Sequence, residues 1–326
     1  MLLVTGGAGF IGSNIVAALN DAGRADVVVC DELGHEGKWR NLAKRQLADI
    51  VPPRKLPDWL NGRRLEAIVH MGAISETTAT DGDLVIEVNF RLSLRLLDWC
   101  TATATPFIYA SSAATYGDGA QGFADDQTLP ALKALRPMNL YGWSKHLFDM
   151  ALAERAGRGE KLPPQWAGLK FFNVYGPNEY HKGSQKSVVA QIYPRAKAGE
   201  ACTLFRAHRP GVPDGGQKRD FVYVRDCVDQ MLWLYDHPRV SGLFNAGTGQ
   251  ARSFLDLATA VFHALDLEPR IDYVDTPAEI RDKYQYFTEA RLERLRDAGY
   301  EGQMVSLEDG VRRYVRDFLL HDDRYR

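Results

Sequence analysis

Leu2-Leu-Val-Thr-Gly-Gly-Ala-Gly-Phe-Ile-Gly12 is the stretch that decides the fold. A short apolar run breaks into glycines at positions 6, 9 and 12, and the helical spacing of Ile15, Val16 and Leu19 follows. This order predicts a strand, a tight turn and the N-terminus of a helix. Such a turn lets the backbone approach a pyrophosphate, which lies against unpaired N–H groups and the positive end of the helix dipole. A P-loop is excluded, because it needs Lys-Ser/Thr after its last glycine and Ser13-Asn14 stands here.

An acidic residue follows the next apolar run at the expected distance. Val27–Cys30 ends in Asp31-Glu32, nineteen residues after Gly12. A carboxylate at the end of that strand is placed to accept hydrogen bonds from the hydroxyls of an adenosine ribose. The glycine turn and this acid together predict a dinucleotide cofactor.

Tyr141-Gly-Trp-Ser-Lys145 supplies a tyrosine and a lysine on one helix face, because they stand four residues apart. A tyrosine acts as a base only when its pKa, ordinarily about 10, is lowered, and a nearby ammonium and a positive nicotinamide both favour the phenolate. Lys145 is also expected to reach the nicotinamide ribose. Ser112, after the expected strand Pro106–Ala110, is placed to hydrogen-bond the reacting oxygen. The alternative is a surface pair with no catalytic role.

Composition sets further bounds. The 326 residues contain 40 Lys and Arg against 42 Asp and Glu, so no basic excess predicts a nucleic-acid partner or an anionic membrane surface. The longest apolar runs have the length of strands, so no membrane span is expected. The four cysteines lack the paired spacing of a metal site, and no metal is predicted. No signal peptide precedes the first strand, and a reducing cytoplasm is the expected location.

Strand-like and helix-like patterns alternate through the first half of the chain, which predicts an α/β fold with a doubly wound parallel sheet (Rossmann). Strands are expected at Leu2–Thr5, Val27–Cys30, Ala67–His70, Pro106–Ala110 and Leu169–Val174, with Gly242–Ala246 returning to the sheet. Helices are expected at Gly12–Ala22, Leu84–Ala102, Tyr141–Arg155 and near Ser187–Ala198. We predict a dinucleotide-binding domain at 1–174, joined by 241–266, and a smaller, interleaved α/β substrate domain at 175–240 and 267–326.

The order of the glycine turn, the serine at the strand end and Tyr-x-x-x-Lys resembles the extended short-chain dehydrogenase/reductase superfamily. Further motifs resemble one family within it, the ADP-L-glycero-D-manno-heptose 6-epimerases, over essentially the whole chain. They are Tyr109-Ala-Ser-Ser-Ala-Ala-Thr-Tyr-Gly117, Phe172-Asn-Val-Tyr-Gly-Pro177, His181-Lys-Gly-Ser184, Lys218-Arg-Asp-Phe-Val-Tyr-Val224 and Tyr284-Gln-x-Phe-Thr288. His-Lys-Gly-Ser after Tyr-Gly-Pro is the most discriminating, because generic sugar 4-epimerases lack that lysine.

The resemblance implies an epimerase that inverts C6 of a nucleotide-linked heptose by transient oxidation and re-reduction. Inversion with one flat cofactor requires acid/base groups that serve two orientations of the substrate. Tyr141 and Lys182 are the implied pair, with Ser112 polarising the oxygen and Lys145 serving the cofactor. A phosphate or solvent contact is the alternative role of Lys182, and His181 is expected to be structural.

The resemblance also implies two sets of binding residues. The cofactor would be lined by Gly6, Gly9, Phe10, Ile11, Gly12, Asp31, Glu32, Lys38, Met71, Gly72, Ala73, Ile74, Ser75, Asn89, Tyr141, Lys145 and Val174. The substrate would be lined by Ser112, Asn173, Ser184, Gln191, Phe205, Arg206, Ala207, His208, Arg219 and Tyr284. Arg219 suits a diphosphate, because its guanidinium can bind two oxygens.

Cofactor choice depends on two opposed charges. Asp31 favours a free ribose 2′-hydroxyl and hence NAD. Lys38, with Arg40 nearby, would instead hold a 2′-phosphate, and the resembled family uses NADP. We predict NADP, with NAD as the alternative, and a homo-oligomer.

Three rival functions follow from the same motifs. A dehydratase of the superfamily would carry Asp-Glu where Ala113-Ala114 stands, so elimination lacks its acid. Another nucleotide-sugar epimerase or reductase stays open, since the loop from Arg206 to Gln217 is longer than in the resembled family. A sensor that binds cofactor without catalysis is disfavoured, because the Tyr-x-x-x-Lys motif is kept.

Overall fold

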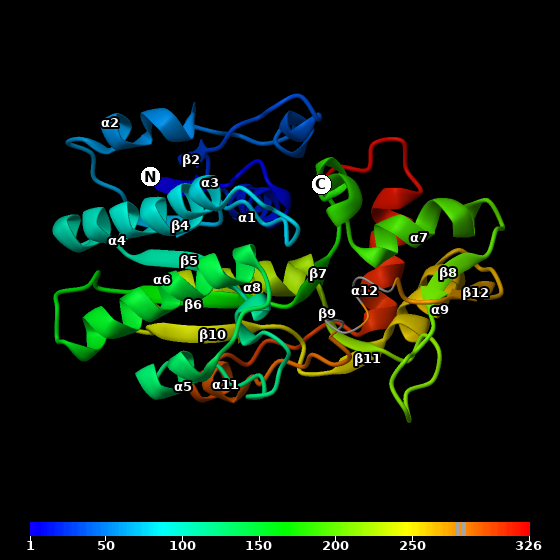
Figure 1. Cartoon of the computed structure of the whole chain (residues 1–326). Helices are drawn as coiled ribbons and strands as arrows, with labels where there is room; N and C mark the ends of the chain where they lie inside the picture. Colours follow the sequence, from blue (N-terminus) through cyan, green and yellow to red (C-terminus); the bar gives the residue numbers. More distant parts are fainter. Residues whose placement is uncertain (278–280, 282–284) are drawn as a thin grey trace.

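The computed structural model describes residues 1–277, 281 and 285–326. Its largest element is a seven-stranded sheet made of β1 (Leu2–Thr5), β2 (Val27–Cys30), β3 (Asp49–Val51), β4 (Ala67–His70), β5 (Phe107–Ser112), β6 (Trp166–Phe171) and β10 (Gly242–Ala246). The strands are parallel and lie in the order β10-β6-β5-β4-β1-β2-β3 (Figure 1). The order reverses between β1 and β4, and a doubly wound sheet binds its ligands at the carboxyl edge beside that point. The predicted Rossmann fold is confirmed.

Helices cover both faces of this sheet because alternate residues of each strand point to opposite faces. The long helices are α1 (Phe10–Asp21), α4 (Leu92–Thr103), α6 (Leu140–Gly157) and α8 (Val224–Asp236). Leu2 and Val4 share one apolar cluster with α1 and α8. Leu3 shares the other with α4 and α6. Short helical segments complete this part: α2 (Leu56–Leu60), α3 (Gly82–Ile86), α5 (Leu129–Ala134), η1 (Lys38–Asn41), η2 (Pro53–Lys55), η3 (Glu87–Arg91) and η4 (Ala113–Tyr116).

A smaller lobe lies beyond the carboxyl edge of the sheet (Figure 1). It contains a three-stranded sheet of β7 (Asn173–Tyr175), β9 (Lys218–Tyr223) and β11 (Ala251–Ser253), and a two-stranded sheet of β8 (Cys202–Phe205) and β12 (Ile271–Val274). Its helices are α7 (Val188–Lys197), α9 (Phe254–Ala264), α12 (Leu307–Tyr314) and the segments η5 (Tyr180–Gln185) and η6 (Val315–Leu319), and α11 (Glu293–Asp297) lies against β10. A third apolar cluster joins α7, α9 and α12.

The predicted division of the chain into two units stays a prediction. Two helices pack on elements of the unit to which the sequence did not assign them. The helix α8 packs on α1 and on strands β5 and β6 of the large sheet. The helix α9 packs on α7 and α12 of the smaller lobe. The strand β10 pairs with β6, which confirms that Gly242–Ala246 returns to the large sheet.

Two expected elements differ from the structure. The single strand expected at Leu169–Val174 is two strands, because β6 pairs with β5 and β10 in the large sheet whereas β7, after Phe172, pairs with β9 in the three-stranded sheet. The single helix expected at Leu84–Ala102 contains the π-helical segment η3. Within that segment Asn89 is fully buried and bonds the backbone of Ile74. The strand β3 was not predicted at all.

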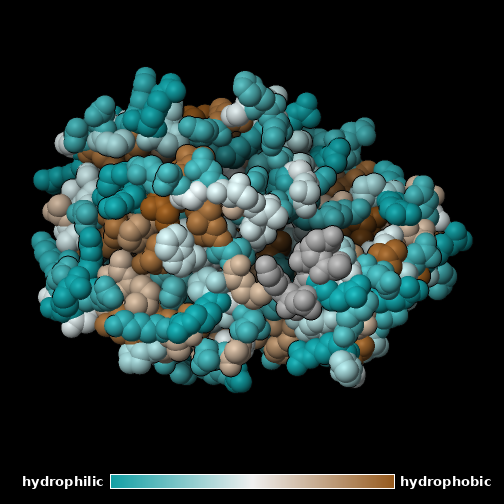
Figure 2. Space-filling view, in the orientation of Figure 1, coloured by the Kyte–Doolittle hydropathy of each residue, from teal (hydrophilic) through white to brown (hydrophobic). Residues whose placement is uncertain are grey.

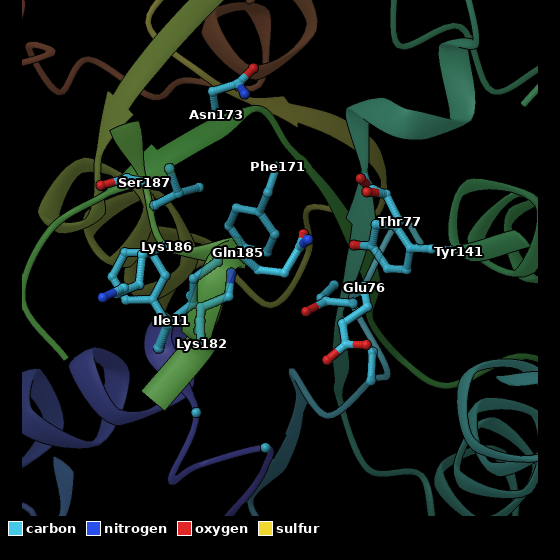
Figure 3. Close-up of a pocket in the computed structure, with 18 of the residues that line it drawn as sticks. Ile11, Glu76, Thr77, Tyr141, Phe171, Asn173, Lys182, Gln185, Lys186 and Ser187 are labelled. Atoms are coloured by element: carbon cyan, nitrogen blue, oxygen red, sulfur yellow. The ribbon is translucent and has the colours of Figure 1, made fainter. Parts of the chain in front are cut away.

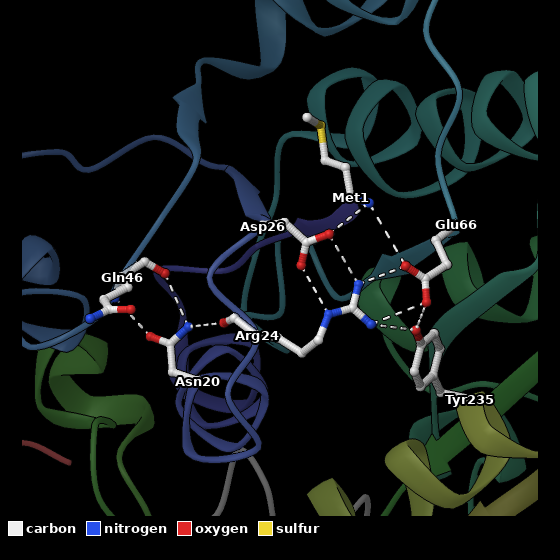
Figure 4. A network of polar contacts seen from close by, with 7 residues as sticks. All are labelled: Met1, Asn20, Arg24, Asp26, Gln46, Glu66 and Tyr235. Carbon is white, nitrogen blue, oxygen red and sulfur yellow. Dashed lines mark hydrogen bonds and ion pairs between the residues drawn. The ribbon is translucent and has the colours of Figure 1, made fainter.

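A polar network ties the amino ends of the central strands to α8 (Figure 4). Arg24 donates to Asp26 at 2.9 Å, to Glu66 at 2.6 Å and to the Tyr235 hydroxyl at 3.0 Å. The Met1 amino group lies 2.8 Å from the Asp26 carboxylate. Hydrogen bonds from Arg24 and Tyr235 lower the pKa of Glu66 to about 2. This edge of the sheet is therefore fixed at the end opposite to the expected ligand site.

The surface offers no large apolar area on the face shown in Figure 2, where apolar side chains form small separate groups among hydrophilic ones. Within the part of the chain that the structure describes, no helix has both the length and the apolar character that a membrane span requires.

Candidate active site

The glycine turn forms a cradle between β1 and α1 that side chains would fill. Gly6 has a φ of +64°, and a Cβ added there would stand 2.6 Å from the Cα of Gly72. A Cβ on Gly12 would stand 2.1 Å from the Gly6 oxygen. Gly9 is the N-cap of α1 and supplies no side-chain cap, so the first turn presents its N–H groups. These observations fit a pyrophosphate at the helix N-terminus.

Asp31 and Lys38 form an ion pair at one end of this cradle. The Lys38 Nζ lies 2.6 Å from Asp31 Oδ1, and the N–H of Ala8 donates to Asp31 Oδ2 at 2.8 Å. The backbone N–H of Glu32 also donates to Asp31, at 2.8 Å. Both Asp31 and Lys38 line the cavity, whereas the Glu32 side chain does not. Asp31, which favours NAD, and Lys38, which favours NADP, are therefore in direct contact.

The segment Met71–Ser75 forms the wall beside the cradle and lines the cavity. Asn89 holds this wall from behind. It accepts from the Ile74 N–H at 2.8 Å and donates to the Ile74 oxygen at 2.9 Å and to Ser144 at 3.0 Å. Asn89 is fully buried and does not itself line the cavity.

Tyr141, Ser112 and Lys145 meet where β5 ends and α6 begins. The helix starts at Asn139, whose side chain accepts from the Gly142 N–H at 2.8 Å. Ser112 lies close enough to Tyr141 for its hydroxyl to lower the pKa of the phenol in part. Burial lowers the pKa of Lys145 to about 8, against a partial increase from the negative charge of Asp149. The three residues all line the cavity, and their catalytic roles stay predictions.

The pKa of Tyr141 corrects one expectation. The sequence predicts that Lys145 lowers this pKa. In the structure burial raises it above 10.0, the Ser112 hydroxyl lowers it in part, and the charge of Asp149 raises it further. Lys145 is not among the groups that shift it. A Tyr141 phenolate therefore requires additional positive charge next to the phenol.

Lys182 lies on the opposite side of the same cavity (Figure 3). Its Nζ stands 5.7 Å from the ring centre of Phe10, at the start of α1. Burial lowers its pKa below the usual 10.5, and the charge of Glu179 raises it in part. The cavity measures about 870 Å³ and extends from the glycine cradle to β7 and η5. Two titratable groups thus face one space from two sides.

The residues expected around the substrate divide into two groups. Asn173 and Ser184 line the cavity, and Gln191 donates to the Ser184 oxygen at 3.3 Å without lining it. Phe205, Arg206, Ala207, His208 and Arg219 lie outside the lining. The Arg219 guanidinium stacks over Phe254, a lining residue, at 5.6 Å. Tyr284 lies outside the described residues.

The loop that begins at Arg206 is closed onto the segment after β12. The His208 N–H donates to the Tyr286 hydroxyl at 3.0 Å, and the Thr276 N–H donates to His208 Nε2 at 3.1 Å. Gln217 donates to the Arg206 oxygen at 3.2 Å and closes the base of the loop. The loop is therefore tied down beside the cavity rather than inside it.

Sequence reasoning missed several residues that line the cavity. They are Glu36, Glu76, Thr77, Thr78, Ala110, Ser111, Phe171, Phe172, Tyr175, Gly183, Gln185, Lys186, Ser187, Val188, Phe221, Phe254 and Leu257. His181, which was expected to be structural, lines the cavity as well. Glu76 and Thr77 lie near Tyr141 in Figure 3. Their place directly after Met71–Ser75 was the available signal. No cluster of His, Cys, Asp or Glu that could hold a metal occurs among the described residues.

Comparison with known proteins gives one consistent result. Residues 2–247 match the NAD dependent epimerase/dehydratase family. The chain is 50% identical over 329 residues to a protein of Nitratidesulfovibrio vulgaris (strain DP4) named ADP-L-glycero-D-manno-heptose-6-epimerase, with 100% of both chains covered. A protein of the same name from Fusobacterium nucleatum is 44% identical over 335 residues, again with 100% of both covered.

Solved structures agree with these sequences. The Helicobacter pylori ADP-L-glycero-D-manno-heptose-6-epimerase superimposes with a TM-score of 0.80 at 29% identity, covering 96% of this chain and 94% of that one. The Thermus thermophilus UDP-glucose 4-epimerase, solved with NAD, gives a TM-score of 0.73 at 27% identity, covering 96% and 97%.

Proposed function

The chain belongs to the NAD dependent epimerase/dehydratase family, and from that premise we propose that it converts ADP-D-glycero-D-manno-heptose to ADP-L-glycero-D-manno-heptose. The full-length relatives carry this activity in their names. The reaction inverts C6 by transient oxidation and re-reduction. The observation that supports it best is the placement of Tyr141 and Lys182 on opposite sides of one cavity (Figure 3).

Inversion needs a proton acceptor and a proton donor that reach the C6 oxygen in two orientations. Tyr141 on α6 and Lys182 on η5 come from separate elements, so a substrate that turns between them meets one group in each orientation. The lowered pKa of Lys182 brings its loss and gain of a proton closer to neutral pH, which favours acid/base catalysis. Each residue acts as base in one direction of the reaction and as acid in the other.

Ser112 acts on Tyr141, and Lys145 serves the cofactor. Ser112 lowers the pKa of the phenol in part, and its hydroxyl is placed to donate to the C6 oxygen when the substrate enters. Lys145, with a pKa of about 8, is mostly an ammonium at neutral pH and brings positive charge into the cavity. A nicotinamide dinucleotide, when bound, supplies the acceptor and donor of the C6 hydride.

The cofactor is proposed to be NADP, held along the glycine cradle with its pyrophosphate at the N-terminus of α1. The ion pair with Lys38 offsets the charge of Asp31, which would otherwise repel a 2′-phosphate. Lys38 is about a quarter exposed and adjoins the cavity, so a phosphate can reach its ammonium. The family description and the Thermus thermophilus structure name NAD, which stays the alternative.

The substrate is proposed to enter beside Asn173 and Ser184, with its diphosphate towards Arg219. The guanidinium of Arg219 stands over Phe254, which lines the cavity, so a phosphate at that wall comes within its reach. Glu76 and Thr77 near Tyr141 offer hydrogen-bond partners to sugar hydroxyls. A homo-oligomer and a cytoplasmic location stay predictions.

The experiment is a substrate panel without added cofactor. Purified protein is incubated with ADP-D-glycero-D-manno-heptose and with UDP- and GDP-hexoses, and products are identified by NMR while absorbance at the reduced-nicotinamide wavelength is followed. We expect conversion of the ADP-heptose alone, with no steady absorbance change. A stoichiometric demand for cofactor would instead identify a reductase, and turnover of a UDP-hexose would identify a 4-epimerase.

A further inference from the structure

The segment that carries Lys182 is held against the helix α1 by three buried polar residues. Asn14 donates to the Pro177 oxygen at 3.0 Å, and Asn178 donates to the Ser13 hydroxyl at 3.0 Å. Asn41 donates to the Asn178 oxygen at 3.0 Å. Asn178 is fully buried and has a φ of +73°, so this backbone conformation is maintained by its contacts. Lys182 follows one turn later, and its N–H donates to the Glu179 oxygen at 3.1 Å.

The C-terminal segment Asp322–Arg326 reaches the same place from the other lobe. It leaves η6 and ends beside η5 and α1 (Figure 1). The Arg326 N–H donates to Asn178 Oδ1 at 3.0 Å, and its guanidinium bonds Asp21 at the end of α1 at 3.0 Å. This segment therefore contacts both the Lys182 segment and the helix of the cofactor cradle.

Aromatic and charged contacts continue the attachment. The Tyr180 hydroxyl donates to the Arg324 oxygen at 2.8 Å, and the rings of Tyr180 and Tyr325 stand 5.2 Å apart, edge to face. Lys44 donates to the Tyr325 oxygen at 2.6 Å. The segment therefore packs on η5 through Tyr180 and is also bound by Lys44, which precedes β3 in the chain.

We propose that Asp322–Arg326 is a positioning strap for Lys182. This inference rests on the proposed function, in which Lys182 exchanges a proton with the substrate. On the C-terminal side of Lys182 stands Gly183, exposed and with a φ of +54°, and no atom lies within 4 Å of a Cβ built there. The nearest attachment on that side is Gln191, which donates to the Ser184 and Lys186 oxygens at 3.3 and 2.7 Å, and Gly183 separates it from the lysine. The position of Lys182 therefore depends on the Asn178–Tyr180 turn, which the strap clamps against α1.

A purely structural role is the competing explanation, in which the strap only stabilises the fold. The two roles differ in their consequences. A stabilising contact changes the free energy of unfolding and loosens the cavity as a whole. A positioning contact changes the exposure and reactivity of Lys182 while Lys145, on α6 across the cavity, keeps its environment.

The test compares amine labelling of two lysines in one protein. The full chain carrying Tyr325→Ala and Arg326→Ala is treated with acetic anhydride, and labelling rates of Lys182 and Lys145 are read by mass spectrometry. Arg312→Ala is the matched control, because it removes an exposed ion pair with Asp309 on the neighbouring helix α12. Arg326→Lys is the conservative variant, which keeps a cation for Asp21.

We expect Lys182 to be labelled roughly threefold faster or more in the double variant, because labelling follows the population of open conformations. Lys145 should react at the wild-type rate. In turnover of the ADP-heptose, kcat should fall about tenfold to a hundredfold with little change in KM, since small displacements of a catalytic group carry costs of this size. Arg326→Lys should recover most of kcat, and Arg312→Ala should match wild type in both assays.

Three results would overturn the proposal: an unchanged Lys182 rate, parallel increases at Lys182 and Lys145, or faster labelling with an unchanged kcat. The labelling assay needs no substrate. If the wild type does not turn over the ADP-heptose, the proposed function fails while the effect of the strap on Lys182 is still measured.

Discussion

Replacing Lys182 by methionine separates a proton-transfer role from a phosphate contact. Methionine keeps most of the aliphatic stem and removes the ammonium. Among the described residues no carboxylate stands within ion-pair distance of the Lys182 ammonium, which lies 5.7 Å from the centre of the Phe10 ring. A partly exposed cation–π contact contributes about 0.5–1 kcal/mol. The variant should therefore stay folded, so a loss of activity cannot be attributed to unfolding.

The expected loss is in kcat. A general acid or base contributes roughly 10²–10⁴-fold, which corresponds to about 3–5 kcal/mol of transition-state stabilisation at 1.36 kcal/mol per decade. Lys182→Met should lose a factor in this range with little change in KM, and Tyr141→Phe should do the same. Each variant should still catalyse partial dismutation of a C6 aldehyde analogue, because one of the two groups remains.

Steady-state turnover of the ADP-heptose measures this loss, with Lys197→Met as control. Lys197 is an exposed lysine at the end of α7, so the same chemical change is made away from the cavity. A Lys182→Met variant that keeps its kcat and shows only a raised KM would make Lys182 a phosphate contact. The two-base mechanism would then have to be abandoned.

Three further outcomes are expected. Lys38→Ala should weaken NADP binding about 10- to 150-fold, since a charged hydrogen bond contributes about 1.5–3 kcal/mol. Calorimetric titrations should show NAD binding nearly unchanged, and equal losses for both cofactors would refute the assignment of NADP. Gly12→Ala should abolish cofactor retention through purification, because its Cβ would stand 2.1 Å from the Gly6 oxygen, and a variant purified with normal cofactor content would contradict this. Burial lowers the pKa of His70 from 6.5 to about 3, so between these pH values the unfolded chain binds a proton that the folded chain does not. The free energy of unfolding should therefore fall as the pH drops below 6.5, by about 1.4 kcal/mol per pH unit from this group. His70→Asn should flatten that slope in urea titrations between pH 6 and pH 4, and an unchanged slope would show that His70 is not responsible.

The strands of the large sheet were predictable where burial on both faces leaves a continuous apolar run. Leu2–Thr5, Val27–Cys30, Ala67–His70 and Gly242–Ala246 have the bounds that the sequence indicated. The edge strand β3 was not predicted, because Asp49 and Ile50 are exposed and only Val51 is buried. A short, half-exposed strand carries too little apolar signal to distinguish it from a loop.

The site was predictable where local motifs carry it. The glycine turn, Ser112 and Tyr141-x-x-x-Lys145 all line the cavity because each lies at the carboxyl edge of the sheet. The pairing of Asp31 with Lys38 was not predictable, since it depends on how η1 folds back over the end of β2. The same limit applies to Arg326, whose contacts with Asn178 and Asp21 join residues far apart in the chain.

The pKa of Tyr141 shows the limit of motif reasoning about electrostatics. Spacing places an ammonium on the same helix face, but it does not show how deeply the phenol is buried or that Asp149 stands close enough to raise the pKa. Desolvation and neighbouring charges depend on the assembled fold.

In the proposed reaction C6 itself is oxidised and then reduced within one catalytic cycle. The direct measurement is turnover of ADP-D-glycero-D-manno-heptose in D₂O, without added cofactor, followed by NMR of the product. We expect the L-glycero epimer with protium retained at C6, because the hydride taken from that carbon is returned to it. Deuterium at C6 or at a neighbouring carbon would show exchange of that hydrogen with solvent and would rule out direct return of the hydride to C6.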